Sequence, residues 1–219
     1  MSQETPRPPA TPQFGSVQPG GPIHAYEPGQ DFQVFKRSVA DFDNNCYLIR
    51  CRHTDESLLI DASAEPDLLA DMIGDSRLVG IAQTHGHHDH VRALKDLADR
   101  YQVPVYAHPG DDYPAPTEAL ADGQPLTVGR VTVSAWHVPG HTPGSTAFLV
   151  DGFLLSGDTL FPGGPGNTFG DARAFQQIMT SLDRLFELPD DTRICPGHGL
   201  DSTIGRERPF VPTWLERGW

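Results

Sequence analysis

The sequence predicts an α+β fold for one domain that runs from about residue 29 to residue 219. Three observations carry this prediction. Short apolar runs bounded by turn-forming residues are typical of strands, and amphipathic stretches with three- and four-residue spacing are typical of helices. Histidine and aspartate residues also recur directly after several of the strand-like runs. The length of 219 residues fits a single domain of ordinary size.

The first 28 residues are rich in proline and contain few apolar side chains. Such a segment cannot bury enough apolar surface to offset the conformational entropy it would lose on ordering. We therefore expect residues 1–28 to be a disordered tail. Its later part, around Ile23 to Tyr26, is the portion that could instead lie against the domain.

The composition excludes some classes of partner. A net charge of −13 argues against binding to nucleic acid or to an anionic membrane, both of which need a basic face. The three cysteines are an odd number without disulfide-framework spacing, which indicates a reducing compartment. No signal-peptide pattern opens the chain, and no apolar run approaches ~18 residues. We expect a cytoplasmic protein, and the sequence leaves its oligomeric state open.

The first half alternates between strands and helices. A helix should begin near Pro66 and end at Gly74, and another should follow His90 as far as Tyr101, because apolar residues recur there at helical spacing. The predicted strands are residues 32–35, 45–50, 57–61, 78–83 and 103–107. The polar, Pro-rich stretch from 111 to 121 gives no clear prediction.

Hairpins dominate the second half. An Asp-Gly turn at 151–152, between two apolar runs, is a strong hairpin signal. Residues 161–170 read as a Gly/Pro loop, and a long amphipathic helix should cover 172–188. The remaining predicted elements are strands at 126–128, 131–136, 146–150, 153–156 and 192–195, and a short helix at 203–208.

The most informative stretch is Thr84–His90, which has the spacing H-x-H-x-D-H. Its pattern residues are His85, His87, Asp89 and His90. Imidazole nitrogens and carboxylate oxygens are ligands for zinc and other divalent metals. His88 lies between these ligands and is expected to face solvent. The loop also stands between a strand and a helix, which would brace it on both sides as a precise metal site requires.

Three further candidate ligands follow later strands, each beside a glycine: His141, Asp158 and His198. Loops at strand ends are where a scaffold brings together groups from distant parts of a sequence. With the first four ligands they make five imidazoles and two carboxylates. That number suits two four- or five-coordinate metals with a bridging water.

The motifs resemble, in order, those of the metallo-β-lactamase-fold hydrolases: H-x-H-x-D-H, G-H-T at 140–142, G-D-T at 157–159 and P-G-H-G at 196–199. The resemblance implies a four-layer αββα sandwich with two divalent metals at one edge of its sheets. Zinc is expected first, with iron and manganese as alternatives. The implied assignment places His85, His87 and His141 on one metal. It places Asp89, His90 and His198 on the other, with Asp158 as the bridge.

The implied reaction is hydrolysis by a hydroxide that bridges the two metals. Asp89 is expected to be catalytic as well as a ligand, because it could orient the nucleophile or a proton. Residues 157–161, followed by glycines at 163, 164 and 166, are similar to glyoxalase II (hydroxyacylglutathione hydrolase). This similarity implies a small thioester substrate, with Phe161, Asn167 and Phe169 as its contacts.

The sequence also departs from glyoxalase II. Asn167 replaces a lysine, Phe169 replaces an aromatic hydroxyl, and Leu200 replaces a tyrosine that contributes to the family's glutathione grip. With 21 residues after His198, we expect the short bacterial type, which lacks the helical C-terminal domain. A different thiol carrier is therefore an alternative to glutathione.

Other activities on the same fold remain open. One is a persulfide dioxygenase with a single iron held by His85, His141 and Asp158, although Thr159 and the 165–170 loop do not match that group. A lactonase or another ester hydrolase is a second alternative. An RNA-processing nuclease is disfavoured by the acidic charge, and a non-enzymatic binding protein by the complete ligand set.

Overall fold

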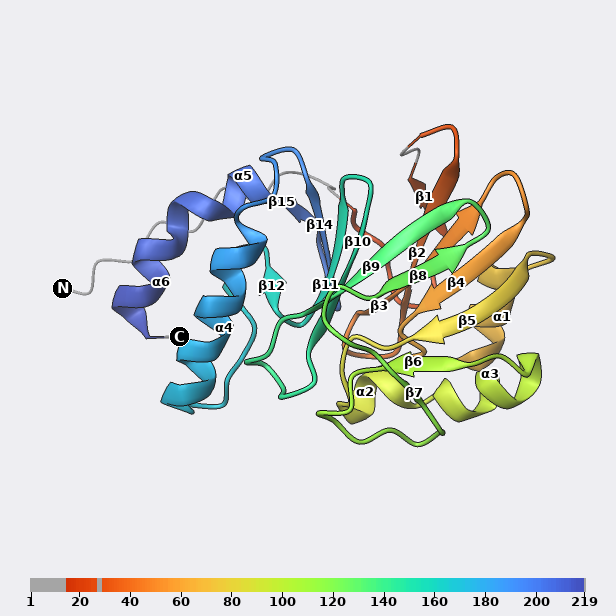
Figure 1. Cartoon of the computed structure of the whole chain (residues 1–219), viewed down its shortest axis with the longest axis horizontal. Coiled ribbons are helices and arrows are strands. Elements are labelled where there is room, and N and C mark those ends of the chain that lie inside the picture. The colour runs from red at the N-terminus through yellow and green to blue at the C-terminus, as the bar shows by residue number, and fades with distance from the viewer. Residues whose placement is uncertain (1–14, 27–28, 219) are drawn as a thin grey trace.

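Two sheets lie face to face in the computed structural model, and helices cover both outer faces (Figure 1). The structure describes residues 15–26 and 29–218. One sheet has seven strands in the order β1-β2-β3-β4-β5-β6-β7, and the other has six in the order β15-β14-β11-β10-β9-β8. The predicted α+β class and the four-layer αββα arrangement are confirmed.

The first sheet begins antiparallel and ends parallel. Strands β1 to β4 pair in antiparallel fashion, whereas β4, β5, β6 and β7 are parallel neighbours. Its strands are β1 (His24–Tyr26), β2 (Phe32–Val39), β3 (Asn44–Cys51), β4 (Glu56–Ile60), β5 (Arg77–Ala82), β6 (Val105–Ala107) and β7 (Glu118–Ala119).

The second sheet is built on the two predicted hairpins. The hairpin β10–β11 turns at Asp151 and Gly152, and β11 then pairs in parallel with β14. Its strands are β8 (Pro125–Val128), β9 (Val131–His137), β10 (Thr146–Val150), β11 (Phe153–Gly157), β14 (Arg193–Pro196) and β15 (Ser202–Thr203). A separate two-stranded ribbon, β12 (Leu160–Phe161) with β13 (Gly164–Pro165), lies in the predicted Gly/Pro loop.

The helices form the two outer layers. Buried side chains of α1 and α3 pack on the outer face of the first sheet, and those of α4 and α6 pack on the second. The helices are α1 (Pro66–Ile73), α2 (His88–Val91), α3 (Leu94–Tyr101), α4 (Ala172–Leu185), α5 (Ile204–Glu207) and α6 (Val211–Arg217), with the 3₁₀ helix η1 (Arg208–Phe210) before α6. Among the described residues, no helix is both long enough and apolar enough to cross a membrane.

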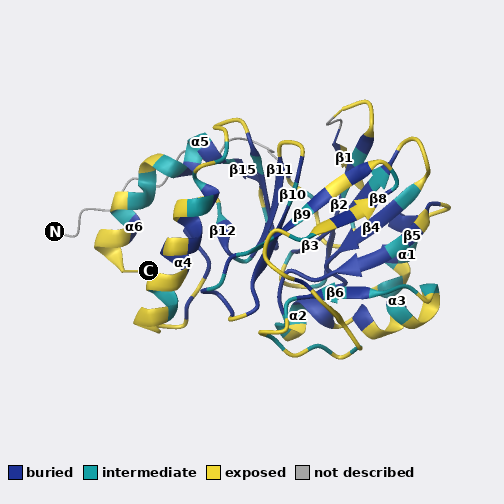
Figure 2. Cartoon of the chain, viewed as in Figure 1, coloured by how far each residue is buried: buried dark blue, intermediate teal, exposed yellow. Residues whose placement is uncertain are grey.

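Figure 2 shows that the central strands are largely buried, and the alternation of side chains along each strand explains how they pack between two layers. In β3, Tyr47 and Ile49 point into the cluster between the two sheets, whereas Leu48 points outward to the helices. In β11, Leu155 joins the same central cluster and Leu154 packs beneath α4. Both faces of each sheet are therefore buried, which is why these strands read as nearly continuous apolar runs.

Two predictions about the elements need correction. The tail predicted for residues 1–28 extends too far, because residues 24–26 form β1 at the edge of the first sheet; residues 1–14 and 27–28 lie outside the described residues. The helix predicted after His90 is two helices. The chain breaks between them because Arg92 N–H donates to Ser63 O and Ala93 N–H to Ala62 O, rather than to helical carbonyls.

The topology gathers several strand ends at one edge. The carboxyl ends of β4 and β5 lie together because these strands are parallel. In the second sheet β9, β11 and β14 all run in one direction, since β10 is antiparallel to β9 and β11. The sheets meet at these ends, where Thr146 N–H donates to Thr84 O (2.8 Å) and Asn45 N–H to Gly197 O (2.7 Å).

Candidate metal centre

The structure brings together all seven side chains that the sequence predicts as ligands. They form three overlapping groups whose ligand atoms lie within 4.8 Å of one another. The groups are His85, His87 and His141; His85, His90 and Asp158; and Asp89, His90 and His198. The first and third match the two sets that the sequence resemblance implied.

The first group lies where the loop after β5 meets the loop after β9. His87 Nδ1 and His141 Nε2 are 2.9 Å apart. The His85 ring is 4.8 Å from that of His87 and 4.9 Å from that of His141, each nearly perpendicular. Nitrogen ligands at about 2.0–2.1 Å from a tetrahedral zinc are themselves about 3.3 Å apart. The nitrogens of His87 and His141 are close to that spacing, and the ligand atoms of all three residues lie within 4.8 Å of one another.

The second group joins α2 to the loop after β14. His90 Nε2 lies 3.0 Å from His198 Nε2, and Asp89 Oδ2 lies 3.6 Å and 3.5 Å from these two nitrogens. The side chain of Asn44 donates to Asp89 Oδ2 at 2.9 Å. The amide therefore fixes the orientation of this carboxylate.

Asp158 lies between the two groups. One oxygen, Oδ1, is 3.5 Å from His90 Nε2; the other is 3.6 Å from His141 Nε2 and 3.4 Å from His198 Nε2. Both Asp158 Oδ1 and His85 Nε2 are buried without a hydrogen-bond partner. Buried polar atoms of this kind call for a partner. Two divalent cations fit this donor set, and they would satisfy both atoms.

Backbone carbonyls orient the rings of His141 and His198. The Nδ1 atoms of His141 and His198 face the carbonyl oxygens of Asn167 (2.8 Å) and Phe42 (2.7 Å). Because a carbonyl only accepts, each Nδ1–H must donate, which leaves the lone pair of a neutral ring on Nε2.

Asp61, just after β4, extends this network to the rings of His85 and His90. Its carboxylate accepts from Thr84 N (2.7 Å) and Thr84 Oγ1 (2.8 Å), and it lies 3.0 Å from His90 Nδ1. Since the Thr84 hydroxyl proton points to Asp61, Thr84 Oγ1 accepts from His85 Nδ1 at 3.0 Å. One buried carboxylate thus orients two ligand rings, and we did not predict its role from the sequence.

The electrostatics favour bound cations. Burial lowers the pKa of His85 well below its usual value, and the neighbouring His90 adds to this effect. Burial raises the pKa of Asp158, but the surrounding imidazoles, His90 foremost, outweigh it and hold that pKa far below its ordinary range. The pKa of His90 shifts in the opposite direction from that of His85. Burial lowers it, but Asp158 and Asp61 raise it to about 9. A dication at this site would replace the proton of His90.

Glycines beside the ligands allow the loops to approach closely. A Cβ on Gly197 would lie 2.2 Å from Asp158 Oδ1 and 2.8 Å from His90 Cε1. A Cβ on Gly157, which has a positive φ of 50°, would lie 2.6 Å from Thr84 Cβ. The glycines of the G-D-T and P-G-H-G motifs are therefore required by this crowding.

Asp111 is a second residue that we did not predict from the sequence. Its Oδ2 accepts from Gly86 N (2.9 Å) and Thr142 Oγ1 (2.7 Å), and its Oδ1 accepts from Gly144 N (2.9 Å). Gly86 lies inside the H-x-H-x-D-H loop, and Thr142 follows His141. Asp111 therefore joins the two loops that carry the first ligand group. A sequence pattern gives no sign of it, because the contact is purely tertiary.

The three predicted substrate contacts all lie at the rim of this centre. The Phe161 ring is 6.3 Å from that of His198, and the Phe169 ring is 5.9 Å from those of His87 and His141. Asn167 contributes its carbonyl to His141, and its side chain accepts from Phe169 N. Their contact with substrate remains a prediction. His88 is exposed, as expected.

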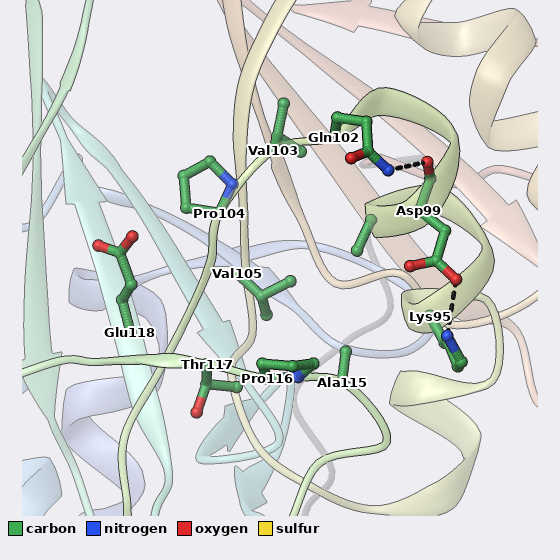
Figure 3. A pocket seen from close by; sticks show the side chains of 11 residues that line it. Lys95, Asp99, Gln102, Val103, Pro104, Val105, Ala115, Pro116, Thr117 and Glu118 are labelled. Atoms are coloured by element: carbon green, nitrogen blue, oxygen red, sulfur yellow. Dashed lines mark hydrogen bonds and ion pairs between the residues drawn. The ribbon is translucent and has the colours of Figure 1, made fainter.

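A groove away from the metal centre is a weaker candidate for a functional site. It has a volume of about 360 Å³ and lies between the end of α3 and residues 115–118 (Figure 3). Several of its polar groups pair with one another, since Lys95 Nζ contacts Asp99 Oδ2 and Gln102 Nε2 donates to Asp99 O, both at 2.6 Å. We assign no reaction to it.

The chain is similar to several known proteins. The family model of the metallo-beta-lactamase superfamily matches residues 39–198. An uncharacterized protein from Aquifex aeolicus is 32% identical over 190 residues, which covers 77% of this chain and 90% of the relative.

Two solved structures support the same relationship. ETHE1 from Myxococcus xanthus has a TM-score of 0.74 and 29% identity, covering 84% of both chains. TTHA1623, solved in a di-iron-bound form, has a TM-score of 0.70 and 31% identity, covering 80% of this chain and 96% of its own.

Proposed function

Because the chain belongs to the metallo-beta-lactamase superfamily, we propose that it is a metal-dependent hydrolase that cleaves thioesters, as glyoxalase II does. One observation carries the proposal. Seven candidate ligand side chains converge in three overlapping groups, and Asp158 lies between the two outer groups with its Oδ1 buried without a hydrogen-bond partner. Zinc is the proposed metal. Iron and manganese are the alternatives, and the di-iron form of TTHA1623 is compatible with iron.

The ligand residues would hold the metals, and the metals would activate the water and the substrate. Two bound dications would lower the pKa of a water between them and polarise the substrate carbonyl. The five imidazoles and Asp158 would hold the two cations in a fixed geometry. The site would then need little reorganisation when negative charge develops on the substrate.

We expect Asp89 to orient the attacking water or its proton. Asn44 fixes its Oδ2, while the other carboxylate oxygen remains for orienting the attacking water. Hydrolysis breaks the acyl C–S bond, adds hydroxyl to the carbonyl carbon and delivers a proton to the thiolate sulfur. Burial raises the pKa of Asp89, but Asn44 and His90 lower it below its ordinary value, so Asp89 is ionised near neutral pH and can accept a hydrogen bond from the attacking water.

The proposed substrate is a small thioester. The net charge of −13 gives no reason to expect a nucleic-acid or anionic-membrane partner. The test combines metal analysis with a panel of S-lactoyl and other S-acyl derivatives of glutathione and of other low-molecular-weight thiols. We expect two metals per chain and release of free thiol. A fully metallated protein that releases thiol from no member of the panel would overturn the proposal.

The second candidate is a persulfide dioxygenase with one iron on His85, His141 and Asp158, and the similarity to ETHE1 is compatible with it. A single iron would leave Asp89 and His198 without a function, although both converge with His90 in a group of their own. One iron per chain, with oxygen uptake on glutathione persulfide, would favour this candidate over the hydrolase. Adding a lactone to the substrate panel tests the lactonase or ester-hydrolase alternative.

A further inference from the structure

Exposed apolar residues occur in the segments that adjoin the metal centre. Five large apolar residues of the described chain are exposed: Ile23, Phe42, Phe169, Leu200 and Leu215. Scattered exposed apolar side chains are ordinary, whereas grouped ones mark a binding surface. Three of the five belong to segments that adjoin the candidate ligands. The Phe169 ring lies 5.9 Å from the rings of His87 and His141, the backbone carbonyl of Phe42 accepts from His198 Nδ1, and Leu200 follows His198 by two residues.

The Phe169 ring is held in place by its backbone. Its φ is +53°, a conformation that bulky residues rarely adopt and that is most often found at functional positions. Its N–H donates to Asn167 Oδ1 at 2.7 Å, and the Asn167 carbonyl accepts from His141 Nδ1 at 2.8 Å. One short loop therefore fixes a ligand imidazole and holds a ring that is 70% exposed beside it.

Phe42 has an equivalent place beside the second group. It lies in the turn between β2 and β3, flanked by Ala40 and Asp43, whose φ angles are +59° and +58°. Asp43 braces the turn, because its side chain accepts from Ser38 Oγ and its carbonyl accepts from the N–H of Gly199. The Phe42 side chain is nevertheless 68% exposed. Both phenylalanines are thus carried by backbone that also orients a metal ligand.

We propose that Phe42 and Phe169 determine specificity by binding an apolar acyl chain, so that the preferred substrates are medium-chain acyl thioesters rather than hydroxyacyl ones. This proposal rests on the proposed function. The low-molecular-weight thiols that carry acyl groups are polar, so the apolar part of such a substrate is its acyl chain. Covering the exposed rings with that chain removes apolar surface from water on both partners.

The test measures kcat/KM of the metallated protein on N-acetylcysteamine thioesters with acetyl, butyryl, hexanoyl and octanoyl groups. Complete burial of each added methylene would raise kcat/KM up to about fourfold, and we expect at least a tenfold rise from acetyl to octanoyl. Phe42→Ala and Phe169→Ala should each reduce the octanoyl-to-acetyl ratio several-fold, and the double variant should reduce it most. Leu215→Ala removes a side chain of similar exposure on α6 and should leave the ratio unchanged.

Binding of a non-hydrolysable octyl thioether to the metallated protein gives a second readout, measured by calorimetry. The double variant should bind it at least tenfold more weakly than the wild type or Leu215→Ala. A chain-length profile that is flat, or thioether binding that the double variant retains, would overturn this inference even if thioesters are hydrolysed. If no thioester is hydrolysed while the thioether binds as expected, the proposed function fails and the apolar site stands.

Discussion

At the scale of single residues, Asp158 connects the two halves of the metal centre. It lies 3.4–3.6 Å from imidazole nitrogens of His90, His141 and His198, and its Oδ1 is buried without a hydrogen-bond partner. No other carboxylate in the three ligand groups contacts imidazoles of both metal sets. The centre should therefore depend on it more than on any peripheral ligand.

Asp158→Ala is expected to abolish both metal binding and hydrolysis. The substitution removes the only negative charge that the two cations would share. Metal content by elemental analysis and thiol release by absorbance measure the two effects. Asp183→Ala, an exposed aspartate of α4, is the matched control and should retain both. Full metal occupancy in Asp158→Ala would contradict the bridging role.

Asp61→Asn tests the residue that orients two of the ligand rings. Asp61 has a positive φ of 60°, which asparagine tolerates, so the change alters hydrogen bonding more than backbone geometry. An amide cannot accept from Thr84 N, Thr84 Oγ1 and His90 Nδ1 together. We expect metal affinity to fall about 10–100-fold, as measured by competition with a chelating dye. Unchanged affinity would mean that Thr84 and His90 are held by packing alone.

At the scale of elements, the sequence predicts what is local and misses what depends on distant partners. The β10–β11 hairpin and α1 appear where their turn and capping residues indicate. The break between α2 and α3 is invisible in the helical spacing, because it depends on carbonyls of residues 62 and 63. The ribbon β12–β13 is two residues on each side, too short for any periodic pattern.

The same contrast holds for the centre itself. The seven ligands could be predicted because metal chemistry restricts their types and the strand ends restrict their positions. Asp61, Asn44 and Asp111 could not, since many aspartates and asparagines follow strands or turns without contacting a ligand. Their roles are defined by the elements that the fold places beside them.

Asp111→Ala should loosen the connection between the two ligand loops. It removes the acceptor for Gly86 N, Thr142 Oγ1 and Gly144 N at once. Hydrogen bonds to charged groups contribute about 1.5–3 kcal/mol each and are not additive, so we expect a loss of ~2–4 kcal/mol in unfolding free energy. Urea denaturation of the metal-free protein measures it. Asp112→Ala changes the exposed neighbour and is the control; an equal loss there would refute a specific role for Asp111.

At the scale of the whole molecule, the centre exists only if the two sheets stay in register at one edge. The bridge between Asn44 and His198 and the bond from Thr146 N to Thr84 O cross this junction. A buried ion pair lies behind it, where Lys36 Nζ of the first sheet contacts Asp201 Oδ1 at 2.9 Å beside the second. Lys36 Nζ also donates to the carbonyl of Gly199, next to the ligand His198.

Lys36→Met should therefore weaken the whole junction. Both partners have fully buried side chains, and removing one leaves the other's charge uncompensated, which typically costs about 3–5 kcal/mol. The lower end is expected, because Tyr26 and Arg193 still donate to Asp201 Oδ2. Urea denaturation of the metal-free protein gives the unfolding free energy, and a dye competition gives the affinity of the site that contains His198, which should also fall.

Two comparisons separate the ion pair from simple loss of a side chain. Lys95 is the chain's other lysine and pairs with Asp99 on the surface. Solvent screens that pair, so Lys95→Met should change stability little. The double variant Lys36→Met/Asp201→Asn removes both buried charges and should be more stable than Lys36→Met alone, because neither fully buried charge remains. If the two lysine variants lose equal stability, the junction is held by packing and backbone bonds, and His198 would keep its metal affinity without Lys36.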